Sequence, residues 1–283
     1  MTLEAADTPP PADLRSTAQR LDELIGGYGS AIVAFSGGVD SALVAVTAAR
    51  VLGHRALAVT AESPSYPTRH RRLALDVAHQ FGLRHEFIST AELSRPEYRS
   101  NPVNRCYYCK SELYTTLASM ASARGVAVIA DGSNADDRGD YRPGRQAARE
   151  HGVRSPLDDV GLTKAGIREL ARDIGMSTWD EPASACLSSR VPYHTAITDQ
   201  ALRMIERAED GVRGLGFRVC RVRHYDDAAR LEIGADELSR AQEPEWREKI
   251  LGAVREAGYT HVTIDPRGYR MGSLNEGIPL RAV

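Results

Sequence analysis

The chain has 283 residues, of which 42% are hydrophobic and 26% are charged, an ordinary composition for a globular protein with room for two domains. Its formal net charge of −2 argues against a broad nucleic-acid-binding surface, and no apolar run approaches the length of a membrane span. Four cysteines in a chain of this length do not make a disulfide scaffold. We therefore expect a cytoplasmic protein with neither a nucleic-acid nor a membrane partner.

Strand-like and helical stretches alternate through the first part of the chain. Residues 1–13 are acidic and rich in proline, which predicts a disordered tail. The expected elements that follow are helices over 14–25, 42–50, 68–81, 108–124 and 163–175, interleaved with strands over 31–35, 55–60, 85–89 and 126–130. This alternation predicts an α/β fold with a doubly wound parallel sheet, whose sites lie at the carboxyl ends of the strands.

From about residue 198 the pattern of the sequence changes. The expected elements are a helix over 199–215, strands over 217–225 and 230–233, a helix over 244–257 and a strand over 261–264. Helices and strands in this order predict a small α+β domain. We therefore expect an α/β domain over 14–195 and a smaller α+β domain over 196–283.

The segment Ser36–Ser41, with sequence S-G-G-V-D-S, joins the first expected strand to the next helix. Gly37 and Gly38 can take backbone angles that other residues avoid, and the N-terminus of the helix supplies N–H donors and a positive dipole to an anion. Asp40 offers a carboxylate to a magnesium ion that bridges phosphates. A purely structural turn is the poorer interpretation, because a buried turn rarely needs two hydroxyls and a carboxylate together.

This segment resembles the PP-loop of the ATP pyrophosphatase superfamily, whose fold is of the adenine nucleotide alpha hydrolase type. Members cleave ATP to AMP and pyrophosphate and thereby adenylate an oxygen of a second substrate. The resemblance implies that ATP and its pyrophosphate are bound by Ser36, Gly37, Gly38, Asp40 and Ser41. It also implies that Asp40 is a ligand of Mg²⁺.

The positions of the cysteines are more informative than their number. Cys106 and Cys109 form a C-x-x-C pair near a helix start, which is consistent with a redox pair, half of a metal site or two incidental thiols. Cys186 lies in a loop at the domain junction, where the nearby Arg190 would favour the nucleophilic thiolate. Together these three cysteines would suit an iron–sulfur cluster with one open iron. Cys220, in an expected strand, is most simply a small buried hydrophobic residue.

Two further segments carry polar residues that can bind ligands. The segment Asp131–Asp137 follows a strand and is crowded with side-chain acceptors, which either line the nucleotide site or only shape a turn. Arg221 and Arg223 alternate along a strand, so both can point at one phosphate. Arg270 is a third candidate for the same phosphate.

Over most of the chain the sequence is similar to the LarE family, the ATP-dependent sulfur transferases that help to build the nickel-pincer nucleotide of lactate racemase. The similar segments are 36–41, 104–110, 131–137, 181–193 and 263–276. The resemblance implies that ATP adenylates the carboxylates of pyridinium-3,5-biscarboxylic acid mononucleotide and that sulfur then converts them to thiocarboxylates. It further implies that Arg221, Arg223 and Arg270 hold the phosphate of this small-molecule substrate, and that the protein is a homo-oligomer.

The resemblance leaves two sulfur donors open. In the sacrificial route, Cys186 forms a thioester with the substrate and is converted to dehydroalanine when its sulfur is released. In the other route, Cys106, Cys109 and Cys186 hold a [4Fe–4S] cluster that passes on a bound sulfide. The cofactors expected are therefore ATP and Mg²⁺, with the cluster added in the second route only.

Three other functions are rivals to this interpretation. An amide-forming PP-loop ligase, such as an NAD or GMP synthetase, has no need of three placed cysteines. A tRNA thiolase predicts a basic surface, against which the near-neutral charge argues. A non-catalytic regulator would bind ATP without releasing pyrophosphate.

Overall fold

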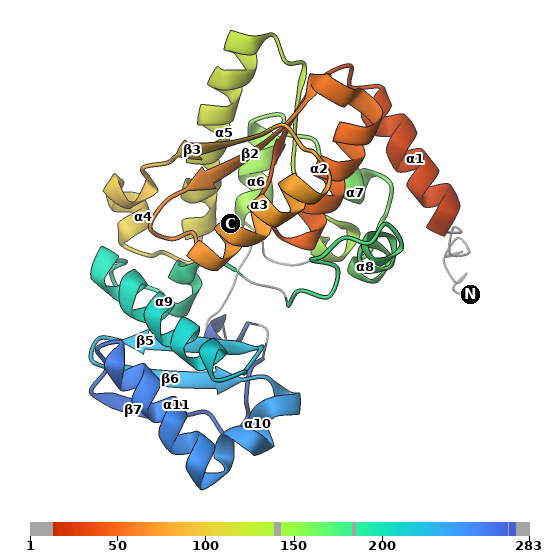
Figure 1. Cartoon of the computed structure of the whole chain (residues 1–283). Helices are drawn as coiled ribbons and strands as arrows, with labels where there is room; N and C mark the ends of the chain where they lie inside the picture. Colours follow the sequence, from red (N-terminus) through yellow and green to blue (C-terminus); the bar gives the residue numbers. More distant parts are fainter. Residues whose placement is uncertain (1–13, 139–142, 183–184, 271, 276–283) are drawn as a thin grey trace, which may run out of the picture.

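A larger α/β part and a smaller α+β part make up the protein (Figure 1). The computed structural model describes residues 14–138, 143–182, 185–270 and 272–275. The tail expected over residues 1–13 lies outside the described residues. Within the described residues, the structure contains no helix with the length and apolar character needed to cross a membrane.

The larger part is built on a four-stranded sheet in the order β3-β2-β1-β4. Its strands are β1 (Ala31–Ala34), β2 (Ala56–Glu62), β3 (His85–Ser89) and β4 (Val128–Ala130). All three strand pairs are parallel, as the alternating pattern predicted. The loops that follow β1, β2 and β4 therefore meet at the carboxyl edge of the sheet.

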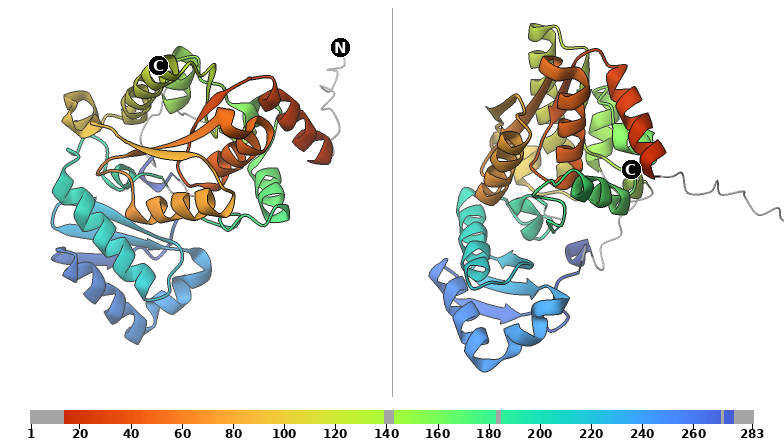
Figure 2. Two further views of the ribbon diagram at one scale, coloured as in Figure 1. Left: turned by 45° about the horizontal axis from the view of Figure 1, so that its top comes forward. Right: turned by 45° about the vertical axis from the view of Figure 1, so that its right-hand side comes forward.

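Helices cover both faces of this sheet (Figure 2). The cluster of buried side chains on one face comes mainly from β1, α1 (Leu14–Gly26), α2 (Val39–Leu52), α3 (Thr68–Gln80) and α8 (Lys164–Asp173). On the other face, α5 (Arg105–Arg124) and α6 (Pro143–Glu150) bury residues such as Tyr114, Leu117 and Ala147. The short helices α4 (Pro96–Arg99) and α7 (Pro156–Asp159) complete this part. The doubly wound arrangement predicted from the sequence is confirmed.

The smaller part has a core of its own. Its elements are α9 (Asp199–Gly214), β5 (Cys220–Tyr225), β6 (Ala228–Ile233), α10 (Ala235–Gln242), α11 (Pro244–Glu256) and β7 (His261–Ile264). The sheet order is β5-β6-β7, antiparallel between β5 and β6 and parallel between β6 and β7. Phe217, Val222 and Ile250 are among the fully buried side chains of its core.

Several element boundaries differ from those expected, and two of the differences bear on the candidate site and the smaller part. Strand β5 begins at Cys220 instead of residue 217, because the backbone N–H groups of Arg218 and Val219 donate to the carboxylate of Glu237 on α10. Helix α5 begins at Arg105, three residues earlier than expected. Both members of the C-x-x-C pair therefore lie in the first turns of a regular helix.

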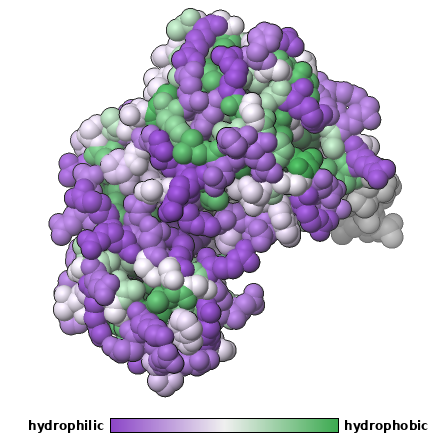
Figure 3. Space-filling model, viewed as in Figure 1, coloured by the Kyte–Doolittle hydropathy of each residue, from purple (hydrophilic) through white to green (hydrophobic). Residues whose placement is uncertain are grey.

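An apolar cluster joins the two parts. It is made of Tyr98, Leu187, Val191, Ile197, Leu202 and Ile205. The 3-10 turn Leu187–Arg190 is held in this way between α4 and α9, so the residue before it, Cys186, lies at the junction. On the face shown in Figure 3, the region between the two parts is largely hydrophilic.

Candidate active site

The PP-loop leaves the carboxyl end of β1 through a glycine that no other residue can replace without strain. Gly37 has a φ of +78°, and a Cβ at this position would lie 2.8 Å from the carbonyl oxygen of His70. The hydroxyls of Ser36 and Ser41 are 3.0 Å apart, and the Ser41 hydroxyl also donates to the carbonyl of Gly38. These bonds hold the loop closed beneath the start of α2.

The N-terminus of α2 is open to an anion. Gly38 is the N-cap of this 14-residue helix and has no side chain to accept from its first N–H groups. Those donors and the helix dipole therefore face the end of the PP-loop, where a phosphate would be stabilised. That an anion binds here stays a prediction.

The loop after β4 packs directly against the PP-loop. A Cβ at Gly132 would lie 2.6 Å from the backbone nitrogen of Ser41, so only glycine permits this approach. Asn134 donates to the carboxylate of Asp40 at 3.5 Å, and Lys164 of α8 pairs with the other oxygen of that carboxylate at 2.5 Å. Sequence reasoning missed Lys164, because only the fold brings it to the loop.

Acidic residues in the same loop mainly shape its backbone. Asp131 is buried and accepts from Tyr114, Ser133 and Ser155 at 2.8–3.1 Å. Asn134 and Asp137 form a reciprocal capping box around a 3-10 turn. The turn-shaping alternative raised for this segment therefore accounts for most of its polar side chains.

The loop after β2 links the PP-loop to the segment of Cys186. The hydroxyl of Tyr66 donates to the carbonyl of Ser36 at 3.1 Å. The carbonyl of Ser65, the residue before Tyr66, accepts from the backbone N–H of Leu187 at 2.9 Å. Cys186 is thereby tied to the edge of the sheet at which the PP-loop lies.

Cys106, Cys109 and Cys186 are close enough to affect one another electrostatically. Burial raises the pKa of the Cys109 thiol well above its ordinary value. Cys186 and Cys106 raise this pKa further, and so does the carboxylate of Glu92. Cys106 is exposed and Cys186 is half-buried. The fourth cysteine, Cys220, is fully buried in the core of the smaller part, as predicted.

Arg190 contacts the backbone of the Cys186 segment. Its Nη1 donates to the carbonyl oxygens of Ala185 at 2.7 Å and of Cys186 at 3.0 Å. Its Nε and Nη2 form a two-pronged ion pair with Glu209 of α9 at 2.8 and 3.0 Å. The sequence had suggested a guanidinium directed at the thiol, whereas these bonds go to the main chain.

Known proteins match the chain over different lengths. The NAD synthase family matches residues 19–100, which include the PP-loop. An uncharacterized protein of Synechocystis is 41% identical along 262 residues, which are 93% of this chain and 98% of that protein. The pyridinium-3,5-bisthiocarboxylic acid mononucleotide synthase of Lactiplantibacillus plantarum, a LarE protein, is 34% identical along 245 residues, which are 86% of this chain and 88% of that enzyme.

The chain belongs to the LarE family. It is therefore an enzyme, and its NAD synthase-like segment contains the PP-loop. The family similarity extends into the smaller part, because the aligned length exceeds that of the α/β part alone.

Of the arginines predicted for a substrate phosphate, two lie side by side in this LarE protein. Arg221 and Arg223 are both buried on β5, two residues apart and therefore on one face. The Arg221 guanidinium lies over the ring of Tyr269 at 5.0 Å. Arg223 is committed to an ion pair with Glu232 at 2.8 Å.

The third predicted arginine lies in the segment after β7. Arg270 donates to the carbonyl of Gly268 at 2.9 Å and lies 3.9 Å from the carboxylate of Asp265. The role of Arg270 at a substrate phosphate stays a prediction.

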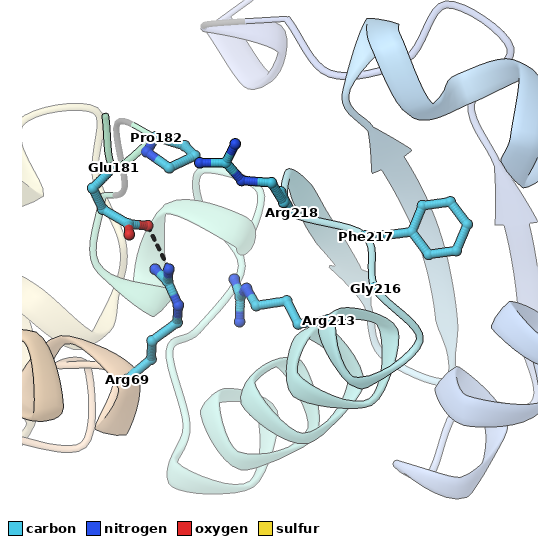
Figure 4. A pocket seen from close by; sticks show the side chains of 7 residues that line it. All are labelled: Arg69, Glu181, Pro182, Arg213, Gly216, Phe217 and Arg218. Carbon is cyan, nitrogen blue, oxygen red and sulfur yellow. Dashed lines mark ion pairs between the residues drawn. The ribbon is translucent and has the colours of Figure 1, made fainter. Parts of the chain in front are cut away.

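A basic cavity of about 220 Å³ opens beside the loop that leads to Cys186. Figure 4 shows Arg69, Arg213 and Arg218 directed into the same space from three different segments, with Phe217 turned away. Arg69 pairs with Glu181 at 2.5 Å, and Arg218 pairs with Asp180 at 2.9 Å. These pairs connect the junction loop to both parts of the enzyme.

Proposed function

We propose that this protein is an ATP-dependent sulfur transferase that converts the carboxylates of pyridinium-3,5-biscarboxylic acid mononucleotide to thiocarboxylates. The observation that carries the proposal is the connection from the PP-loop through Tyr66 and Ser65 to the segment of Cys186. This connection supports the proposal, because it holds the loop that would activate a carboxylate and the cysteine that would attack it at one edge of the sheet.

The first half-reaction is assigned to the PP-loop. The open N-terminus of α2, with Ser36, Gly37, Gly38 and Ser41, would bind the phosphates that leave as pyrophosphate. Asp40 offers a carboxylate beside the amide of Asn134. One oxygen of this carboxylate is paired with Lys164, and Mg²⁺ would replace that ion pair. A single protein carboxylate is enough for Mg²⁺, which takes most of its ligands from substrate phosphates and water.

The second half-reaction is assigned to Cys186. Its thiolate would attack the acyl-adenylate carbonyl, form a thioester and release AMP. Breaking the Sγ–Cβ bond would then leave the sulfur on the substrate and dehydroalanine in the protein. The half-buried setting at a domain junction supports this assignment, since the substrate must reach the thiol.

The residues do not fit the alternative sulfur donor, a [4Fe–4S] cluster, equally well. In the part of the chain that the structure describes, no group of three or more His, Cys, Asp or Glu side chains is arranged to hold a metal. We therefore derive no step through a cluster.

The substrate phosphate is assigned to Arg221, whose buried guanidinium lies over the ring of Tyr269. Arg223 and Arg270 would support this site from the same domain. We further propose that the protein acts in the cytoplasm as a homo-oligomer and without a nucleic-acid partner.

The test is a single-turnover reaction with ATP, Mg²⁺ and the pyridinium dicarboxylate mononucleotide. We expect pyrophosphate release, together with conversion of Cys186 to dehydroalanine in the intact-protein mass spectrum. Cys186→Ala is expected to keep pyrophosphate release and to lose sulfur transfer completely, because adenylation does not need the thiol. Sulfur transfer by this variant would contradict the assignment of Cys186.

Cys106→Ala is the matched control, since it removes a neighbouring thiol that the sacrificial route does not use. We expect it to transfer one sulfur per protein as the unchanged enzyme does. Many turnovers with Cys186 intact, abolished by Cys106→Ala, would favour the cluster. ATP binding without pyrophosphate release would favour a regulator.

A further inference from the structure

The difficult step of the sacrificial route is the loss of a proton from the Cα of Cys186. Rupture of the Sγ–Cβ bond needs electrons from the Cα–H bond, and this proton is only weakly acidic in a peptide. Removing it places negative charge on the carbonyl oxygen of the same residue. A donor aimed at that oxygen stabilises the charge as it develops. A role for such a donor rests on the proposed sacrificial function.

The three nitrogens of Arg190 divide their hydrogen bonds between Glu209 and the segment around Cys186. Nε and Nη2 donate to Glu209 at 2.8 and 3.0 Å, which fixes the plane of the guanidinium. Nη1 is left to donate to the carbonyl of Cys186 at 3.0 Å. Nη1 also donates to the carbonyl of Ala185 and to the hydroxyl of Ser189.

The surroundings of Arg190 keep it charged and strengthen its field. Its side chain is 0% exposed, so its interaction with a new charge is little screened by water. Burial by itself would lower the pKa of Arg190, but Glu209 raises it above the ordinary value. A second arginine, Arg213, also pairs with Glu209, at 2.6 Å, but no bond links it to the Cys186 carbonyl.

A buried carboxylate lies near the same segment with one oxygen available. Glu92 is 1% exposed, and within the described residues its Oε2 has no hydrogen-bond partner. Its Oε1 accepts from the hydroxyl of Ser65 at 2.8 Å, and the carbonyl of Ser65 holds the N–H of Leu187. A buried carboxylate oxygen without a hydrogen-bond partner is costly unless it has a task, such as accepting a proton.

We propose that Arg190 is the catalytic electrophile of the elimination, stabilising the enolate of Cys186, and that Glu92 accepts the Cα proton. In this step the Cα–H bond breaks toward Glu92, a Cα=Cβ double bond forms, and the Sγ–Cβ bond breaks. The electron pair of that last bond leaves with the substrate thiocarboxylate. The step is an elimination without net oxidation, so it needs no further reactant.

The experiment follows the covalent protein–substrate adduct after a single turnover is quenched at successive times. Intact-protein mass spectrometry gives the ratio of adduct to dehydroalanine, which does not depend on how much protein was loaded. In Arg190→Gln we expect the adduct to accumulate and to decay on the order of 100-fold more slowly, as for loss of one oxyanion donor. Arg190→Lys keeps a positive charge and is expected to restore part of the rate.

Arg213→Gln is the matched control, because it removes a guanidinium from the same carboxylate without touching the Cys186 carbonyl. We expect its adduct to decay at the unchanged rate. Equal accumulation in this control would assign Arg190 a structural role only. Glu92→Gln is expected to accumulate adduct as Arg190→Gln does, and normal decay there would remove Glu92 from the step.

The outcomes separate this inference from the proposed function. Adduct decay at the unchanged rate in Arg190→Gln, or in Arg190→Lys where the glutamine variant does not fold, would overturn the role of Arg190. An unchanged enzyme that forms neither adduct nor dehydroalanine would instead contradict the sacrificial function.

Discussion

Gly37 and Gly29 have nearly the same left-handed backbone but different surroundings. Their φ angles are +78° and +72°, so alanine at either position carries a similar strain of about 1–2 kcal/mol. Only at Gly37 would the new Cβ meet the backbone of α3, at 2.8 Å from His70 and 2.9 Å from Ala74. We expect Gly37→Ala to lose clearly more stability than Gly29→Ala, and to lose pyrophosphate release as well.

Urea unfolding and a pyrophosphate assay check this prediction. Because nothing lies within 4 Å of a Cβ at Gly29, that variant isolates the backbone strain. Equal losses of stability in the two variants would mean that the PP-loop yields to the added methyl group.

At the residue scale, sequence reasoning found the groups that a local pattern marks. Ser36–Ser41 lies between a strand and a helix, and a local pattern of that kind is readable from the sequence. Lys164 and Glu92 have no such pattern, because their roles arise from contacts across 124 and 27 residues of chain. Arg190 was noticed from the sequence, but which of its neighbours it bonds depends on Glu209 in the other part of the protein.

Among the elements, α9 carries a charge that ties the catalytic segment to the smaller part. Glu209 is 1% exposed, and although burial alone would raise its pKa, Arg190, Arg221 and Arg213 hold it at about 2. Its ordinary value is 4.5. Because the folded-state pKa is the lower one, the carboxylate contributes stability above pH 4.5, and this contribution is lost as pH falls toward 2.

The expected contribution is about 3 kcal/mol of unfolding free energy at neutral pH. We expect Glu209→Gln to be strongly destabilised at pH 7, since Arg190 would stay buried without its counter-charge. The gap to the unchanged protein is expected to narrow between pH 4.5 and 3 in urea unfolding. Asp210→Asn, which removes a half-exposed partner of Arg213, serves as the control and is expected to show little change. A pH-independent gap would contradict the prediction.

The helices and strands show where periodicity is informative and where it is not. The alternation of helices and strands in the α/β part was predicted because apolar strands and amphipathic helices follow one another regularly along the sequence. Helix α10 was not expected, since its sequence ADELSRAQ has a single buried residue, Ala241. The helix is held in place by Glu237, whose carboxylate accepts from the backbone N–H of Arg218 just before β5. Contacts of that kind follow from the tertiary structure and not from the pattern of a segment.

For the molecule as a whole, the arginines at the junction act on a histidine of the α/β part. Burial lowers the pKa of His70, and Arg190, Arg69, Arg213 and Arg221 lower it further, to about 4. Two of these arginines, on α9 and β5, belong to the smaller part. The pKa of the His70 imidazole therefore depends on how close the charged residues of the smaller part lie to α3.

We expect Arg213→Gln to raise the pKa of His70 toward its ordinary 6.5, because one of the positive charges that disfavour the imidazolium is removed. Titration of labelled histidine by NMR between pH 3 and 8 measures this shift. Arg72→Gln is the matched control: Arg72 lies on the same helix as His70 but is exposed and is not among the charges that act on it. If His70 titrated identically in Arg213→Gln and in the unchanged protein, the predicted electrostatic effect of Arg213 on α9 upon His70 on α3 would be contradicted.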